Sequence, residues 1–301
     1  GGRPVAEGEH PEPPGREIGE AQVVEAADLL TANTADEARQ LVTLYAADPD
    51  RVAVVPPGVD LDVFTPGDRY AARALLGLPH RAHILLFVGR IQPLKAPDLL
   101  VKAARRLLDA HPEWTPEDLV VGILGGPSGS GLEHPESLAT LAADLGMTAY
   151  LRFVPPADRA RLAQWYRAAD LVTVPSYNES FGLVAIESLA CGTPVVAARV
   201  GGLPTAVGPG GVLVDGHDVG DWAATLGRLL ADPAQRESLA ERAVRHASGF
   251  GWGATTQRLL QAYGEACRTQ TPSPITEASL LTGVPAAVVP CLLYTSDAAD
   301  E

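Results

Sequence analysis

The fold is decided by residues 178–187, which read Asn-Glu-Ser-Phe-Gly-Leu-Val-Ala-Ile-Glu. The preceding residues 170–175 (DLVTVP) are mostly apolar and include two valines, which predicts a strand buried in a parallel sheet. Residues 181–190 carry apolar side chains at helical spacing, and Gly192 and Pro194 end that pattern. The stretch therefore predicts a strand, a polar loop and a helix. Free backbone N–H groups and the dipole at such a helix start favour an anion.

Two carboxylates flank this helix start, Glu179 just before it and Glu187 two turns inside it. An acidic side chain beside an anion site is electrostatically unfavourable unless it has a ligand of its own. A carboxylate accepts paired hydrogen bonds from the vicinal hydroxyls of a sugar or a ribose. Alternatively, Glu179 caps the helix and Glu187 is a solvated surface residue. The pair, with Ser-Phe-Gly following Glu179, favours ligand binding.

Residues 178–182 together with Glu187 resemble the Glu-x7-Glu motif of the retaining GT-B glycosyltransferases of family 4. This resemblance implies that Glu179 contacts the donor sugar and that Glu187 contacts the ribose of the nucleotide. It also implies that the backbone amides between them face the sugar and the diphosphate, at Ser180, Phe181, Gly182 and Leu183. The implied fold is α/β of the GT-B type, with one complete Rossmann-like donor domain and the end of a second.

A second loop carries two cations, Arg90 and Lys95, between an expected buried strand and the helix after it. In an acidic chain such charges suit a diphosphate, although an exposed basic loop is the alternative. The loop resembles the G-R-x4-K segment of the same family, which implies that both cations neutralise the departing nucleotide diphosphate. The resemblance makes Arg90, Lys95 and Glu179 the catalytic residues and implies that the chemistry needs no cofactor. Ala96 stands where the family usually has glycine.

Composition limits the classes of partner. The chain has 301 residues, 46% of them apolar, and a formal net charge of −14. This charge disfavours nucleic acid and anionic membranes as partners, and no apolar run approaches membrane-spanning length. The three cysteines are widely spaced and odd in number, which favours a reducing compartment and predicts a cytoplasmic protein.

Strands and helices alternate along the chain, which predicts a parallel sheet with ligands at its carboxyl edge. Strands are expected at residues 28–32, 51–55, 82–88, 119–124, 150–154, 170–175, 195–198 and 211–214. Helices are expected at residues 18–27, 35–46, 71–76, 96–108, 135–145, 158–169, 181–190, 222–230, 234–247 and 252–267. Residues 201–204 (GGLP) are expected to form a loop.

A Pro/Gly-rich segment between the two groups of strands predicts a domain boundary. Residues 1–62 are expected to be the C-terminal remnant of an N-terminal acceptor domain with its linker, and residues 63–250 the donor domain. Residues 251–268 form a return helix, and residues 269–301 an unstructured tail. The last eleven residues, 291–301 (CLLYTSDAADE), resemble a translated sequencing adapter and are excluded from the functional argument. The chain does not begin with Met, so we expect it to be truncated at its N-terminus.

A glycine-rich run at residues 125–129 (GGPSG) follows an expected strand but fails the G-x-G-x-x-G spacing of a dinucleotide site, and a simple turn is the alternative. The run instead resembles one subgroup of family 4, which glycosylates inositol phosphate in mycothiol biosynthesis. So do residues 166–170, 178–188, 192–204 and 213–218, and the resemblance extends over about residues 16–266. It implies UDP-N-acetylglucosamine as donor, 1L-myo-inositol 3-phosphate as acceptor and a homodimer of the full-length protein.

The subgroup also implies a Mg²⁺ site at Tyr166, Arg167, Ala169 and Thr193. Only Tyr166 and Thr193 have side-chain oxygens, so backbone carbonyls would have to supply the remaining ligands.

Arg16 matches an arginine that contacts the acceptor phosphate in the subgroup. Ala157 stands where the subgroup has a donor-contacting arginine, so that contact is not expected here. With only Arg16 on the acceptor side, we expect this fragment to be inactive alone. The last helix should leave an apolar face exposed, at Leu259, Leu260 and Tyr263.

The residues fit three classes of protein. The leading interpretation is a retaining transferase in which the acceptor attacks from the face that the phosphate leaves, and the departing phosphate takes the acceptor's proton. Another family 4 transferase, of mannosyl or sucrose type, and a non-catalytic nucleotide-sugar-binding module are the alternatives. A nucleotide-dependent oxidoreductase is disfavoured by the missing glycine fingerprint.

Overall fold

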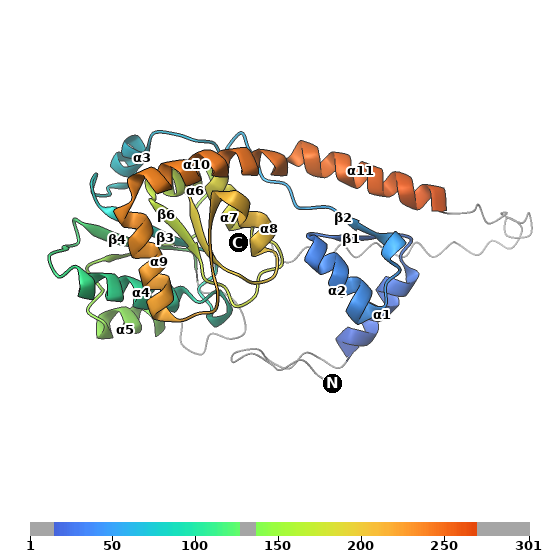
Figure 1. Ribbon diagram of the computed structural model, residues 1–301, viewed down its shortest axis with the longest axis horizontal. Coiled ribbons are helices and arrows are strands. Elements are labelled where there is room, and N and C mark those ends of the chain that lie inside the picture. The colour runs from blue at the N-terminus through green and yellow to red at the C-terminus, as the bar shows by residue number, and fades with distance from the viewer. Residues whose placement is uncertain (1–14, 127–136, 270–301) are drawn as a thin grey trace, which may run out of the picture.

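The computed structural model describes residues 15–126 and 137–269. Residues 127–129 of the glycine-rich run and the adapter-like residues 291–301 lie outside the described residues. The described chain forms two sheets, and all of their strand pairs are parallel (Figure 1). The larger sheet has the strand order β5-β4-β3-β6-β7-β8. Its strands are β3 (His83–Val88), β4 (Leu119–Leu124), β5 (Leu151–Val154), β6 (Leu171–Val174), β7 (Val195–Ala198) and β8 (Gly211–Val214). The predicted α/β class is confirmed.

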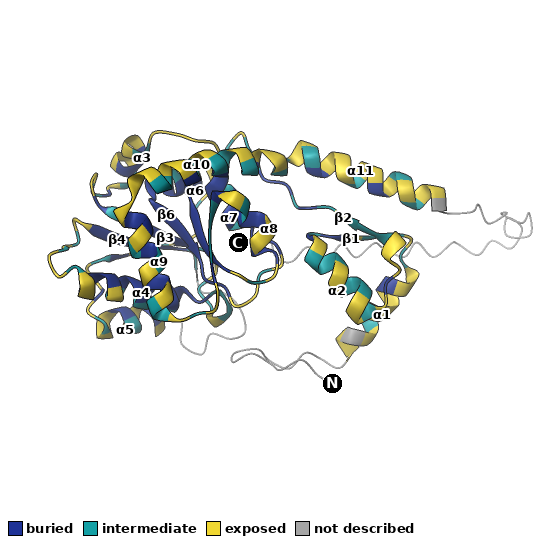
Figure 2. Cartoon of the chain, in the orientation of Figure 1, coloured by how far each residue is buried: buried dark blue, intermediate teal, exposed yellow. Residues whose placement is uncertain are grey.

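Helices cover both faces of the larger sheet, which is why its strands are mostly apolar. Every residue of β4, β6 and β7 is buried. One face packs against α3 (Arg69–Leu76), α6 (Arg159–Ala168), α7 (Leu183–Ala190), α8 (Leu203–Val207) and α10 (Pro233–Ala247). The other face packs against α4 (Pro97–Ala110), α5 (Ser137–Asp144) and α9 (Val219–Ala231). Figure 2 shows the buried sheet between helices whose outer sides are exposed.

The smaller unit consists of α1 (Gly15–Ala26), β1 (Leu30–Ala32), α2 (Ala35–Tyr45) and β2 (Val52–Val54). Thr34 and Glu37 begin α2 with a reciprocal cap: the Thr34 hydroxyl accepts from the Glu37 amide at 3.1 Å, and the Glu37 carboxylate accepts from the Asn33 amide at 2.6 Å. Among the described residues, neither strand of this unit pairs with the larger sheet.

The last helix, α11 (Trp252–Thr269), runs from the larger unit toward the smaller one (Figure 1). The Thr255 hydroxyl donates to the Pro56 carbonyl at 3.0 Å and ties the helix to the segment between the units. As expected, Leu260 and Tyr263 are exposed, at 64% and 60%, whereas Leu259 is half-buried. Over residues 15–126 and 137–269, no helix has both the length and the apolar composition needed to cross a membrane.

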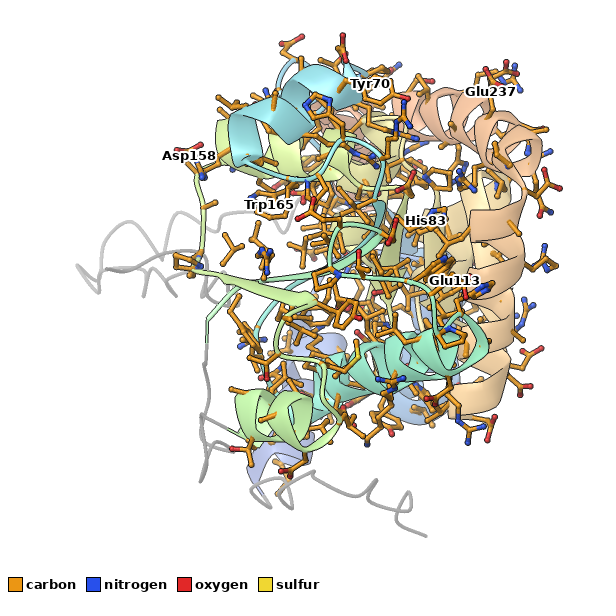
Figure 3. The ribbon with its side chains drawn as sticks, turned by 90° about the vertical axis from the view of Figure 1, so that its left-hand side faces the viewer. Tyr70, His83, Glu113, Asp158, Trp165 and Glu237 are labelled. Atoms are coloured by element: carbon orange, nitrogen blue, oxygen red, sulfur yellow. The ribbon has the colours of Figure 1, made fainter. Side chains whose placement is uncertain are left out.

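A buried ion-pair network fixes α3 against the start of β6. Asp170 accepts from Arg73 at 2.8 Å, from Arg69 at 3.1 Å and from the Ile84 amide at 2.8 Å. The Asp170 and Arg73 side chains are only 6% and 4% exposed. His83, the neighbour of Ile84 and the first residue of β3, is labelled in Figure 3. Asp170 precedes β6, so the network lies at the sheet edge opposite the loops that follow the strands.

Candidate functional site

The loops after β3 and β6 meet at the carboxyl edge of the sheet and place Lys95 against Glu179. The Lys95 ammonium donates to Glu179 Oε2 at 2.7 Å, and the two side chains are 20% and 18% exposed. Lys95 ends a 3₁₀ turn, Pro93–Lys95, that follows β3. The next residue, Ala96, has a φ of 49°, in the left-handed region. Glycine adopts that conformation without strain, which is a physical reason for a glycine at this position in the resembled family.

The other cation of this loop, Arg90, is exposed. Within residues 15–126 and 137–269 it makes no ion pair, so its charge is available to a ligand.

The start of α7 is open to an anion. Gly182 is the N-cap with a φ of 104°, and no side chain of the described residues caps the helix. The positive φ favours glycine at this position, and a Cβ at Gly182 would lie 2.7 Å from Leu203 Cδ2, so a larger residue would also displace the Leu203 side chain. This glycine delays the helix, which begins at Leu183 rather than at Phe181 as predicted. Phe181 and Gly182 are buried, whereas Ser180 and Leu183 on either side of them are exposed.

Gly201 and Gly202, which the sequence predicts only as part of a loop, pack against the backbone of Glu179 and Ser180. The Gly202 amide donates to the Glu179 carbonyl at 2.8 Å. A Cβ would lie 2.0 Å from the Glu179 carbonyl oxygen at Gly201 and 2.3 Å from the Ser180 oxygen at Gly202, so no larger residue fits. The available signal was a glycine pair directly after a strand at the same sheet edge as Glu179.

Glu187 lies half-buried on α7 and accepts a hydrogen bond from the Tyr166 hydroxyl at 2.7 Å. Burial raises the pKa of Glu187 from 4.5 to about 7, while the Tyr166 hydrogen bond acts in the opposite direction. Burial and the neighbouring Glu187 charge raise the pKa of Tyr166 well above its usual value, so this hydroxyl stays a donor. Glu187 is therefore a carboxyl group that titrates near neutral pH.

If ribose hydroxyls donate to Glu187, binding requires the ionised carboxylate and releases a proton below about pH 7. UDP-N-acetylglucosamine should then bind about tenfold more weakly near pH 6 than near pH 8. Each of its phosphates carries one ester and one anhydride link, so neither titrates in this range. Calorimetric titration across pH measures the effect. The Glu187→Gln variant should show a flat profile, and a parent profile that is also flat would exclude ribose binding by the carboxylate.

The raised pKa of Glu187 also makes the stability of the folded protein depend on pH. The folded protein keeps the Glu187 proton between about 4.5 and about 7, where the unfolded chain has lost it. This group therefore makes the free energy of unfolding fall as pH rises through that range.

His217, which the sequence analysis did not single out, ties a third loop to the site. Its Nε2 lies 3.1 Å from the Pro175 carbonyl and 3.3 Å from the Ser176 carbonyl. Because both partners are acceptors, this nitrogen carries a proton. The His217 ring stacks on Tyr177 at 4.0 Å. The Tyr177 amide in turn donates to the Leu94 carbonyl at 2.9 Å, beside Lys95. No local pattern signals this contact, because His217 and Pro175 are distant in sequence.

Replacing His217 by phenylalanine should keep the ring stack but remove the donor to the loop after β6. We expect amide hydrogen exchange at Tyr177 to accelerate about five- to tenfold, as for the loss of one or two ordinary hydrogen bonds. The His217→Gln variant keeps a donor at a similar distance from the backbone and should restore most of the protection. Equal exchange in the parent and in the phenylalanine variant would show that His217 does not hold this loop.

Arg16 is not brought to these residues. It lies on α1 of the smaller unit, where its guanidinium pairs with Glu20 at 2.7 Å. The Tyr45 hydroxyl also donates to Glu20, and these two hydrogen bonds lower the pKa of that carboxyl.

The four residues of the expected Mg²⁺ site lie close together, but the side-chain oxygens of Tyr166 and Thr193 are engaged in hydrogen bonds within the protein. The Tyr166 hydroxyl is bound to Glu187, and its carbonyl accepts from the Thr193 hydroxyl at 2.6 Å and from the Ala169 amide at 3.2 Å. The Arg167 guanidinium adds a positive charge. The set has no carboxylate, the ligand that usually anchors Mg²⁺. The described part of the chain also contains no cluster of three or more His, Cys, Asp or Glu side chains able to hold a metal.

The known proteins that this chain resembles are glycosyltransferases. Residues 68–246 match the glycosyl transferases group 1 family. The chain is 58% identical over 267 residues to the D-inositol 3-phosphate glycosyltransferase of Kribbella flavida. This alignment covers 88% of this chain and 63% of the relative. It is 60% identical over 267 residues to the protein of the same name from Thermomonospora curvata, covering 86% and 62%. The chain thus spans less than two thirds of the length of these relatives.

Solved structures agree on the fold. Sucrose-phosphate synthase from Thermosynechococcus elongatus matches with a TM-score of 0.74 and 31% identity, covering 85% of this chain and 62% of that one. Anabaena HepE, solved in complex with UDP-glucose, matches with a TM-score of 0.72 and 21% identity, covering 82% and 67%.

Proposed function

Since the chain belongs to the glycosyl transferases group 1 family, we propose that it acts in a retaining transfer of N-acetylglucosamine from UDP-N-acetylglucosamine to 1L-myo-inositol 3-phosphate, a step of mycothiol biosynthesis. The main support for a nucleotide-sugar donor is the start of α7, which no side chain of the described residues caps. Lys95 and Glu179 pair beside it, and Glu187 lies on the same helix. The proposal that inositol 3-phosphate is the acceptor is supported by the names of the relatives that are 58–60% identical to this chain.

Each donor group matches a part of the nucleotide sugar. The open amides at the start of α7 and the charges of Arg90 and Lys95 suit the diphosphate. Glu187 suits the ribose hydroxyls, and Glu179 suits the sugar hydroxyls. During transfer, the two cations and the amides stabilise the negative charge that grows on the departing phosphate.

The acceptor attacks from the side that the phosphate leaves, and a phosphate oxygen takes the acceptor's proton. In this proposal Glu179 accepts hydrogen bonds from the sugar hydroxyls and does not act as a nucleophile. No step of this mechanism uses the Mg²⁺ implied by the resemblance.

We also place the protein in the cytoplasm, and the thiols support this. Among the described residues, Cys191 and Cys267 form no disulfide, and a reducing compartment would keep such thiols free. A homodimer of the full-length protein remains a prediction.

Calorimetric titration of the chain with UDP-N-acetylglucosamine, GDP-mannose and NAD tests the donor. We expect binding of the first at least about tenfold tighter than of the other two, corresponding to about 1.4 kcal/mol. Tighter binding of GDP-mannose would favour a mannosyl-type transferase, and tighter binding of NAD would contradict the proposed donor. A transfer assay of the full-length protein with inositol 3-phosphate tests the acceptor, whereas this chain alone is expected to show almost no transfer.

A further inference from the structure

We propose that Glu179 masks Lys95 when no donor is bound, so that the site favours a sugar-bearing nucleotide over the bare nucleoside diphosphate. This inference rests on the proposed function and concerns the selectivity of the same site. The observation behind it is the 2.7 Å ion pair between the Lys95 ammonium and Glu179 Oε2.

The pair is well shielded from solvent. Both side chains are four-fifths covered, and the Ser176 hydroxyl lies 3.4 Å from the same Glu179 oxygen. The Gly202 amide donates a hydrogen bond to the Glu179 carbonyl, which fixes the backbone of the residue that carries this carboxylate. A charge pair in such a place is stronger than a surface pair, and separating it leaves a poorly hydrated carboxylate.

A diphosphate can recruit Lys95 only by taking it from Glu179. The released carboxylate then lies beside the incoming negative charge, without its partner. For bare UDP nothing compensates this loss. For a UDP-sugar, the sugar hydroxyls donate to the carboxylate and replace the lost hydrogen bond. Glu179 therefore opposes the bare nucleotide and accepts the nucleotide that carries a sugar.

This arrangement also bears on turnover. Once the sugar has been transferred, the bound product is UDP, and the carboxylate loses its hydroxyl donors. Glu179 can then reclaim Lys95, which weakens the hold on the product. The same ion pair thus favours donor entry over UDP retention.

The Glu179→Gln variant tests the mask, because glutamine keeps the shape and removes the charge. We expect its affinity for UDP to rise about tenfold relative to the parent protein, while its preference for UDP-N-acetylglucosamine over UDP falls by about as much. In a Lys95→Met background the same substitution removes only the repulsion between the carboxylate and the diphosphate, so the gain in UDP affinity should shrink to about threefold or less.

The matched control is Asp98→Asn. Asp98 pairs with Lys102 at the same distance of 2.7 Å, but both side chains are more exposed and lie on α4. This substitution should leave UDP affinity within about twofold of the parent.

Inorganic pyrophosphate separates the mask from the proposed function, since it needs no base, ribose or sugar pocket. Tighter pyrophosphate binding by Glu179→Gln supports the mask, even if the parent binds no UDP-sugar and the proposed function fails. Unchanged or weaker binding of UDP and pyrophosphate by Glu179→Gln would overturn the mask. A gain in the Lys95→Met background as large as the gain in the parent background would overturn it as well.

Discussion

Replacing Arg90 and Lys95 together by methionine is expected to weaken UDP-N-acetylglucosamine binding by at least about 100-fold. Hydrogen bonds to charged groups contribute about 1.5–3 kcal/mol each, so losing both cations should cost about 3–6 kcal/mol of binding free energy. The lysine replacement also leaves Glu179 without its partner and adds repulsion toward the diphosphate. Calorimetry of the parent and the double variant measures the difference.

The control uses Lys102, the only other lysine of the chain. Lys102 lies on α4 and pairs with Asp98 at 2.7 Å, with both side chains about two-fifths exposed. The Lys102→Met variant makes the same change in residue and charge away from the site, and it should bind within about twofold of the parent. Parent-like binding by the double variant would show that the diphosphate does not lie on the loop after β3.

Replacing Asp170 by asparagine is expected to lower the free energy of unfolding by about 3–5 kcal/mol. The substitution leaves Arg73 buried with its charge uncompensated and weakens the acceptor for the Ile84 amide. For a domain of this size each kcal/mol corresponds to about 2–4 °C, so the thermal midpoint should fall by about 6–20 °C. Thermal unfolding followed by circular dichroism measures it.

An exposed ion pair provides the comparison. Asp109 pairs with Arg105 at 2.8 Å, and its side chain is 60% exposed. The Asp109→Asn variant should cost less than about 1 kcal/mol. The folded Asp170→Asn protein should still bind UDP-N-acetylglucosamine with parent-like affinity, because the network lies at the far edge of the sheet. A midpoint within about 2 °C of the parent's would contradict the structural role assigned to this network.

The strand–loop–helix unit around Glu179 was predictable because its signals are local. Apolar periodicity defines the strand and the helix, and Gly192 and Pro194 mark the end. The helix start was wrong by two residues, since a glycine with positive φ at position 182 delays the first turn. The short helix α8 (Leu203–Val207) was missed, because five residues after a glycine pair carry no periodicity.

Pairing between distant side chains could not be predicted. The sequence indicated that Lys95 and Glu179 serve one ligand, but not that they pair with each other. Likewise, Tyr166 and Glu187 were assigned to different sites, a metal and a ribose, yet they share a hydrogen bond. Such contacts depend on which loops the strand order places side by side. A pattern along the chain does not contain that information.

The family resemblance assigned roles to residues whose sequence spacing alone suggests none. The structure supports some of these assignments better than others. Arg90 lies on the loop before Lys95, with its charge unpaired among the described residues, as a diphosphate ligand requires. Arg16 instead lies on the smaller unit, paired with Glu20. The metal residues are adjacent, but the side-chain oxygens of Tyr166 and Thr193 already have protein partners. Roles are best supported where the structure leaves the group available to a ligand.

A crystal structure of the chain soaked with UDP-N-acetylglucosamine tests the central claim most directly. The claim is that the carboxyl edge of the six-stranded sheet is a nucleotide-sugar site. We expect the diphosphate between the start of α7 and the loop of Arg90 and Lys95, with the ribose on Glu187. The sugar should lie on Glu179, which has released Lys95. A nucleotide bound elsewhere, or one whose diphosphate contacts neither Lys95 nor the amides of α7, would contradict the account.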